Sequence, residues 1–152
     1  MNRWQNHFSF RGRTARQRYW LTNLVLIAVW VVVSLVSRAL VPLSSWLELI
    51  AVPVLAVLLW VYLANTTRRL HDRSKSAWWL IVFVGCPTLS SLLRGLMALN
   101  GASSADGPSN VLLLVSSGFS TWALVELGFL KGAGGSNEFG DDPLMPTADV
   151  FA

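Results

Sequence analysis

His71 and Asp72 are adjacent in the sequence and are its clearest candidates for proton chemistry. Histidine exchanges a proton near neutral pH, and a carboxylate can hold it in one tautomer. Neighbouring residues on a helix do not face each other, however, so these two need further groups to make a catalytic site. They follow Arg68 and Arg69, and cations at a helix C-terminus complement its dipole. The spacing therefore favours a structural or headgroup-binding role, with Asp72 paired to Arg68 or to a basic residue near the N-terminus.

Glu48 and Glu126 lie in or beside long apolar segments. A carboxylate in hydrocarbon is costly and is a functional candidate by default. We expect Glu48 to reach water at an outer boundary, and Glu126 to pair with Lys131 or with the other basic residues at an inner boundary. An ion pathway requires such groups near the middle of the membrane, so the sequence disfavours transport.

The remaining reactive residues do not form a recognisable catalytic or metal-binding pattern. Cys86 is the only cysteine, which excludes an internal disulfide and predicts a small buried side chain. The glycine-rich segment 132–135 resembles a phosphate-binding loop in composition alone, because it lacks the Lys-Ser/Thr pair of such loops. The sequence therefore predicts no catalytic residue, no metal and no cofactor, and a protein that is not an enzyme.

The composition indicates the elements that must position these residues. Hydrophobic residues make up 53% and charged residues 13% of the 152-residue chain, and the mean hydropathy is +0.50. Four apolar runs are long enough to span a bilayer as helices, at about residues 20–41, 46–64, 77–94 and 111–130. We predict an all-α fold, a polytopic membrane bundle of four transmembrane helices over residues 1–143, with a disordered tail at 144–152.

The distribution of Lys and Arg predicts the orientation of this bundle. Ten of the twelve lie in the head before the first run, in the 65–76 connection or at Lys131, whereas Arg38 and Arg94 lie on the other side. Basic residues accumulate in cytoplasmic segments, so both termini are predicted to be cytoplasmic. The net charge of +4 then reflects orientation and attraction to anionic lipid rather than nucleic-acid binding.

Three polar segments on the predicted cytoplasmic side carry distinctive motifs. Residues 10–20 read FRGRTARQRYW, residues 68–79 read RRLHDRSKSAWW, and residues 132–143 read GAGGSNEFGDDP. Together they resemble the YhaH-like family of small bacterial inner-membrane proteins, known as domain of unknown function 805. The residues that carry the resemblance are Arg11, Gly12, Arg13, Arg16, Tyr19, Trp20, Arg68, Arg69, His71, Asp72, Ser76, Trp78, Trp79, Asn137, Phe139, Gly140, Asp142 and Pro143.

The resemblance implies a multi-pass protein of the bacterial inner membrane and implies no reaction. Two positions depart from the family pattern: Arg18 stands where the family usually has Glu, and Glu138 where it often has a basic residue. These two departures suggest a charge pair between head and tail whose signs have been exchanged.

Three functions are compatible with these features. The leading hypothesis is a non-enzymatic scaffold, adaptor or lipid-binding module whose cytoplasmic basic face binds anionic phospholipid headgroups or a membrane or cytoplasmic protein. The alternative is a small transporter or channel subunit that acts as an oligomer. An enzyme acting on lipid headgroups is third, and it requires His71 and Asp72 to border an open pocket.

Overall fold

The computed structural model describes residues 8–40, 46–101 and 107–145, with only the backbone described at residue 40 and at 46–50. Its helical elements are α2 (Arg16–Leu40), α3 (Trp46–Asp72), the π-helix η1 (Ile81–Gly85), α4 (Cys86–Leu99), α5 (Gly107–Ala123) and the π-helix η2 (Leu124–Phe129). Within the described ranges the chain contains no strand, and an isolated bridge joins Asn137 and Gly140. The all-α prediction is confirmed.

Four helical stretches are long and apolar enough to cross a membrane, as the sequence predicted. They are Arg16–Ala39, Ala51–Asp72, Ile81–Leu99 and Gly107–Phe129. Prolines do not interrupt these helices: Pro53 lies inside α3, and Pro87 and Pro108 lie in the first turns of α4 and α5, where the missing N–H costs little.

Helix α3 continues to Asp72, beyond the boundary near residue 64 that hydropathy indicates. The extra turns carry Asn65, Thr66 and Thr67, which are almost completely buried. Polar residues therefore extend this helix because other parts of the protein cover them. The predictions for the side chain of Glu48 and for most of the 144–152 tail concern parts outside the described residues.

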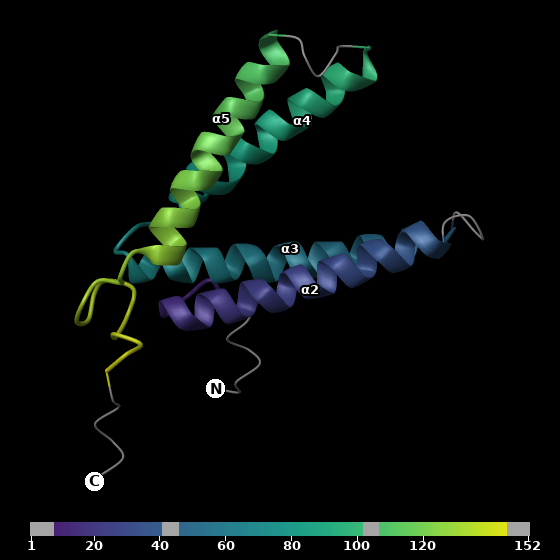
Figure 1. The fold of residues 1–152 in the computed structure, drawn as a ribbon. Helices are drawn as coiled ribbons and strands as arrows, with labels where there is room; N and C mark the ends of the chain where they lie inside the picture. Colours follow the sequence, from purple (N-terminus) through teal and green to yellow (C-terminus); the bar gives the residue numbers. More distant parts are fainter. Residues whose placement is uncertain (1–7, 41–45, 102–106, 146–152) are drawn as a thin grey trace.

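The helices form two hairpins, α2 with α3 and α4 with α5, which diverge from a shared end (Figure 1). The segments that enter α2 and leave η2 both lie at this end (Figure 1). Along the hairpins, large apolar side chains such as Leu24, Val52, Leu92 and Leu114 are exposed, as expected for helices whose surroundings are lipid.

The best-buried part of the molecule is the joint between the two hairpins. Tyr19, Leu70, Phe83 and Leu127 form its apolar core, with Trp79 packed beside them. Buried polar and charged residues surround this core: Thr14, Asn65, Thr66, Thr67, Arg68, Arg69, His71, Asp72 and Glu126. Buried charges are stable only when they are paired, so the joint depends on its hydrogen-bond network.

Candidate functional site

The three sequence motifs meet in one place, which we call the motif cluster: head residues 12–16, the end of α3 at 68–72, and tail residues 132–142. Two backbone hydrogen bonds align the three segments. The N–H of Thr14 donates to the carbonyl of Arg68 at 3.1 Å, and the N–H of Ala133 donates to the carbonyl of Asp72 at 2.7 Å. The end of α3 therefore lies between the head and the tail.

The carboxylate of Asp72 is the central acceptor of the motif cluster. Arg13 donates to its Oδ1 through Nε (3.2 Å) and Nη2 (3.1 Å), and Arg69 donates to its Oδ2. The side chains of all three residues are at most 4% exposed. The predicted pairing of Asp72 with a basic residue of the head is confirmed, and that residue is Arg13. Its partner within α3 is Arg69, whereas the sequence had suggested Arg68.

Arg13 also binds the tail directly. Its guanidinium donates to the backbone carbonyls of Ala133, Gly135 and Gly140. Five N–H donors in a planar fork allow one arginine to bridge a carboxylate and several carbonyls. Arg13 thereby fixes the glycine-rich segment, which the composition predicted to be a turn, against the end of α3.

At the end of the last helix, the backbone carbonyls of residues 127–130 each accept a hydrogen bond from a side chain of another segment. A π-helix and a helix C-terminus both leave backbone oxygens without the usual intrahelical partner. Arg69 donates to Leu127 O (2.8 Å) and Leu130 O, Trp20 Nε1 donates to Gly128 O (3.0 Å), and Arg16 donates to Phe129 O (3.0 Å). Cationic donors also suit the negative end of the helix dipole.

Two glycines allow this close approach. A Cβ on Gly132 would lie 2.1 Å from Oδ2 of Asp72, and a Cβ on Gly128 would lie 2.7 Å from the ring of Trp20. Gly128 and Gly132 have the spacing of a helix-packing motif, and each accommodates a side chain from another segment.

His71 is enclosed by the head and the tail. Its Nδ1 lies 3.2 Å from the carbonyl of Gly12, whose φ of 87° is favourable only for glycine. The ring of Phe139 stacks on the imidazole with 4.0 Å between centroids, and Asn137 Nδ2 donates to the carbonyl of His71 at 2.9 Å. The Asn137 side chain also accepts the N–H of Phe139 and so holds the stacking ring in place.

A second ionic contact ties the 73–75 turn to η2. Glu126 Oε1 accepts from Arg73 Nε at 3.2 Å and lies 3.1 Å from Lys75 Nζ. Lys75 Nζ also lies 4.3 Å from the ring centroid of Trp79, a cation–π contact. Glu126 thus pairs with the basic connection, one of its two predicted partners, and not with the side chain of Lys131.

The tail ends in a compact turn around Asp142. Its carboxylate accepts the N–H of Leu144 (3.0 Å) and of Gly135 (3.1 Å). Both hydrogen bonds stabilise the carboxylate and hold the pKa of Asp142 below its ordinary value, and the bond from Leu144 has the larger effect. The acidic tail is therefore held by hydrogen bonds within itself as well as by those from Arg13.

Other motif residues lie at the edge of the cluster or outside it. Arg11, Ser76, Trp78 and Pro143 are exposed, and Trp78 is 77% exposed. Tyr19 and Trp79 instead pack in the core of the joint. Arg18 and Glu138 are both exposed and form no ion pair with each other within the described residues, so the exchanged charge pair is not observed.

A cavity of about 370 Å³ opens beside the motif cluster. Its charged lining residues are Arg16, Arg69, Asp72, Lys131 and Asp142. Asp72 is neutralised by its two arginine partners, so Arg16 and Lys131 are the exposed cations at this cavity, which Asp142 also lines.

Sequence reasoning found the cluster residues but missed several of their partners. Some of these partners do carry a signal in the sequence. Arg73 and Lys75 lie inside the second motif, and Glu126 is a carboxylate within an apolar run. Gly132 and the backbone carbonyls of η2 gave no comparable signal, because a carbonyl belongs to every residue. Their role depends on where the last helix ends.

Four spans joined by a buried polar cluster define a multi-pass, all-helical membrane protein. A family model described as "Protein of unknown function (DUF805)" matches residues 7–141, and the chain belongs to this family. The predicted resemblance is therefore confirmed over most of the chain.

The chain is also similar to three proteins of Escherichia coli K12. It is 35% identical to inner membrane protein YhaH over 53% of this chain and 67% of YhaH. It is 30% identical to the uncharacterized protein YiiR over 89% of this chain and 86% of YiiR, and 32% identical to inner membrane protein YhaI over 52% and 64%. No solved structure matches the chain. The spans and these relatives identify it as a multi-pass protein of the bacterial inner membrane.

Proposed function

We propose that this protein is a non-enzymatic membrane module that binds anionic phospholipid headgroups beside the motif cluster. The observation that carries the proposal is the division of its basic residues into two sets. Arg13, Arg69 and Arg73 direct their donors to carbonyls and carboxylates of the protein itself. Arg16 and Lys131 are exposed and line the 370 Å³ cavity at the same end.

A phosphate in this cavity has suitable chemistry around it. Arg16 keeps donors beyond the one it gives to Phe129 O, and a guanidinium fork suits a phosphate group. Basic residues near an anionic leaflet each contribute about 1 kcal/mol of attraction. Arg11 and Arg18 are exposed on the same segment and add to this field. The predicted cytoplasmic orientation brings all of these residues to the inner leaflet.

The contacts of His71, Asp72 and Glu126 support structural roles for these three residues. His71 is covered by Phe139, and Asp72 is held between two arginines. A headgroup-modifying enzyme requires these groups to be available to a substrate, and an ion pathway requires a carboxylate that is not already paired twice, as Glu126 is. Lipid binding that leaves these contacts intact is the more economical interpretation.

The experiment is a titration of purified protein with phosphatidylglycerol or phosphatidylcholine, with bound lipid counted by native mass spectrometry. We expect wild type to prefer phosphatidylglycerol. The double variant Arg16→Gln/Lys131→Gln should bind phosphatidylglycerol roughly thirtyfold more weakly, because each of the two charges contributes about 1 kcal/mol of attraction. The matched control Arg16→Lys/Lys131→Arg keeps both charges and should retain the preference.

Equal binding of the two lipids by wild type would contradict the proposal. Unchanged phosphatidylglycerol binding in the Gln variant would do the same. Arg38→Gln, which removes an exposed charge at the far end of α2, should leave the preference intact and controls for net charge.

A further inference from the structure

A second, larger cavity lies between the two hairpins, inside the predicted membrane region. Its volume is about 570 Å³, within the range of roughly 300–1,000 Å³ that is common for ligand pockets. Residues of α2, α3 and η2 line it: Tyr19, Trp20, Asn23, Leu26, Ile27, Trp30, Leu55, Leu58, Leu59, Tyr62, Leu124 and Gly128. Every one of these side chains is uncharged, in contrast to the lining of the basic cavity.

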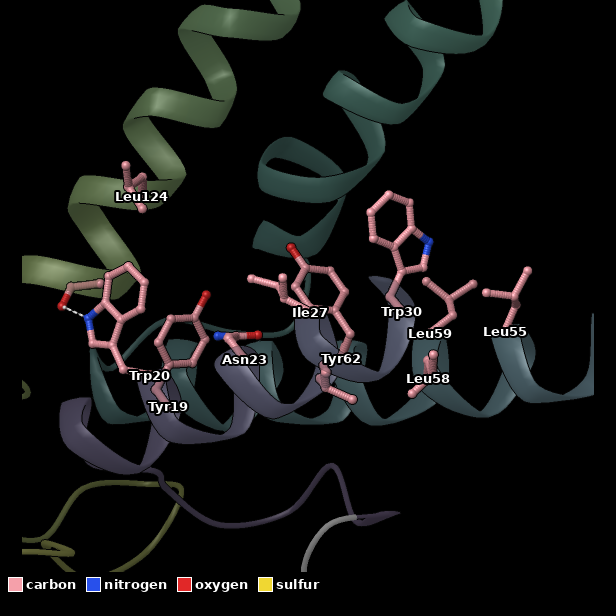
Figure 2. Close-up of a pocket in the computed structure, with 12 residues that line it drawn as sticks. Tyr19, Trp20, Asn23, Ile27, Trp30, Leu55, Leu58, Leu59, Tyr62 and Leu124 are labelled. Atoms are coloured by element: carbon pink, nitrogen blue, oxygen red, sulfur yellow. Dashed lines mark hydrogen bonds between the residues drawn. The ribbon is translucent and has the colours of Figure 1, made fainter. Parts of the chain in front are cut away.

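Three polar side chains of this cavity, Tyr19, Asn23 and Tyr62, lie in the part nearer the joint, and the indole N–H of Trp30 lies farther along the hairpin (Figure 2). Figure 2 shows the Tyr19 side chain beside that of Asn23 and the Tyr62 side chain next along the cavity, with both hydroxyl groups directed away from α2 and α3. Leu55, Leu59 and Trp30 extend farther along the hairpin, away from the motif cluster (Figure 2). The cavity thus has a hydrogen-bonding part near the joint and a largely apolar part beyond it, in which leucines predominate.

The polar part lies at the end of the cavity where the basic residues predict the membrane interface. Tyr19 lies about one turn after Arg16, and Asn65, about two turns before Asp72, donates to the backbone carbonyl of Tyr19. Tyrosine is enriched at this depth, where its ring is in apolar surroundings and its hydroxyl meets polar groups. The ester and glycerol groups of bilayer lipids occupy the same zone.

We propose that this cavity binds one acyl chain of a glycerolipid, with the lipid's glycerol ester beside Tyr19, Asn23 and Tyr62. The ester carbonyl accepts hydrogen bonds from the hydroxyl or amide groups, and the chain lies against the leucines and Trp30. An uncharged lining suits this part of a lipid and gives a phosphate no partner. A transmembrane helix of a second copy would bring side chains but no ester to the polar part.

The test uses a diacylglycerol with a photoactivatable diazirine in one acyl chain, added to the protein in phosphatidylcholine nanodiscs. This probe has no phosphate, so its binding does not depend on Arg16 or Lys131. We expect cross-links to concentrate on the cavity residues. Ile27→Trp/Leu59→Trp narrows the cavity and should lower their yield about tenfold, the effect of an overpacked site.

The matched control is Leu89→Trp/Leu92→Trp on α4. Leu59 and Leu92 are similarly exposed, at 55% and 57%, but Leu92 does not line the cavity. The control should label as wild type does. Equal labelling of the two double variants, or cross-links spread evenly over exposed helix faces, would mean that only annular lipid is present and would overturn the proposal.

A third variant tests the polar part separately. Tyr62→Phe removes one hydroxyl and keeps the ring, so it should reduce labelling by the diacylglycerol and leave labelling by a diazirine alkane unchanged. If the diacylglycerol labels Tyr62→Phe as well as wild type, the ester assignment fails. If Leu59→Cys in a Cys86→Ser background forms disulfide-linked dimers and no lipid adduct appears at the cavity, a second copy is the occupant and the proposal is wrong.

Discussion

Arg69 illustrates why arginine, and not merely positive charge, is required in the motif cluster. Its side chain is fully buried and donates to Asp72 and to the carbonyls of Leu127 and Leu130, which point to it from different positions. A lysine ammonium is a compact charge with three donors on one nitrogen and cannot reach all of these acceptors at once.

We therefore predict that Arg69→Lys destabilises the protein by about 3 kcal/mol, because buried carbonyls lose their donors at a cost of about 1–3 kcal/mol each. The measurement is reversible unfolding in mixed detergent micelles, followed by circular dichroism. Arg18→Lys, at an exposed position of the same protein, is the control and should change stability by less than about 0.5 kcal/mol. Equal stability of the two variants would refute the assigned role of Arg69.

Gly132 offers a second test at the scale of one residue. A methyl group at this position overlaps the carboxylate of Asp72, at 2.1 Å from Oδ2 and 2.7 Å from Cγ. Gly132→Ala should displace Asp72 from Arg13 and Arg69 and destabilise the protein by about 3 kcal/mol, as expected when a buried ion pair is disrupted.

Gly134→Ala is the matched control, because its added Cβ has no atom within 4 Å and its backbone is not in the left-handed region. The same unfolding experiment should find this variant close to wild type. A Gly132→Ala protein as stable as Gly134→Ala would show that the tail is not pressed against Asp72.

At the scale of the element, the end of the last helix is the feature on which the joint depends. The final six residues of this helix form the π-helix η2, and its carbonyls receive donors from Arg69, Trp20 and Arg16. Helices α2 and α3 thus supply the caps that the last helix cannot supply for itself.

Trp20→Phe tests one of these caps. The substitution retains an aromatic ring near Phe129 and removes the indole N–H that donates to Gly128 O, so we expect a loss of about 1 kcal/mol. Trp78→Phe is the comparison, since Trp78 is 77% exposed and should tolerate the change. The two midpoints are compared in thermal unfolding followed by circular dichroism, and a larger shift in Trp78→Phe would contradict the cap.

The elements were more predictable than the contacts between them. Hydropathy indicated four spans, and the motifs indicated which polar segments matter. Hydropathy placed the end of α3 near residue 64, because it scores Asn65, Thr66 and Thr67 as if water surrounded them, whereas the joint buries them. The partners of Arg13 and Arg69 were equally hidden, since most are backbone carbonyls and carry no signature in the sequence.

At the scale of the whole molecule, the structure places the head and the tail at the same end of the two hairpins (Figure 1). Hydrogen bonds from Arg13 to the tail carbonyls require the two segments to lie on one side of the membrane. The distribution of basic residues predicts that this side is the cytoplasm.

Cysteine labelling in cells tests this orientation. In a Cys86→Ser background, Glu138→Cys places an exposed thiol beside the motif cluster, and Leu99→Cys places one at the far end of α4, where Leu99 is 84% exposed. With the outer membrane permeabilised, a charged maleimide that cannot cross the inner membrane should label Leu99→Cys at once, and Glu138→Cys only after the inner membrane is disrupted. The reverse pattern would put the motif cluster outside the cytoplasm and remove it from the inner leaflet. Labelling of both thiols in intact inner membranes would mean that the two ends of the hairpins are not separated by a bilayer.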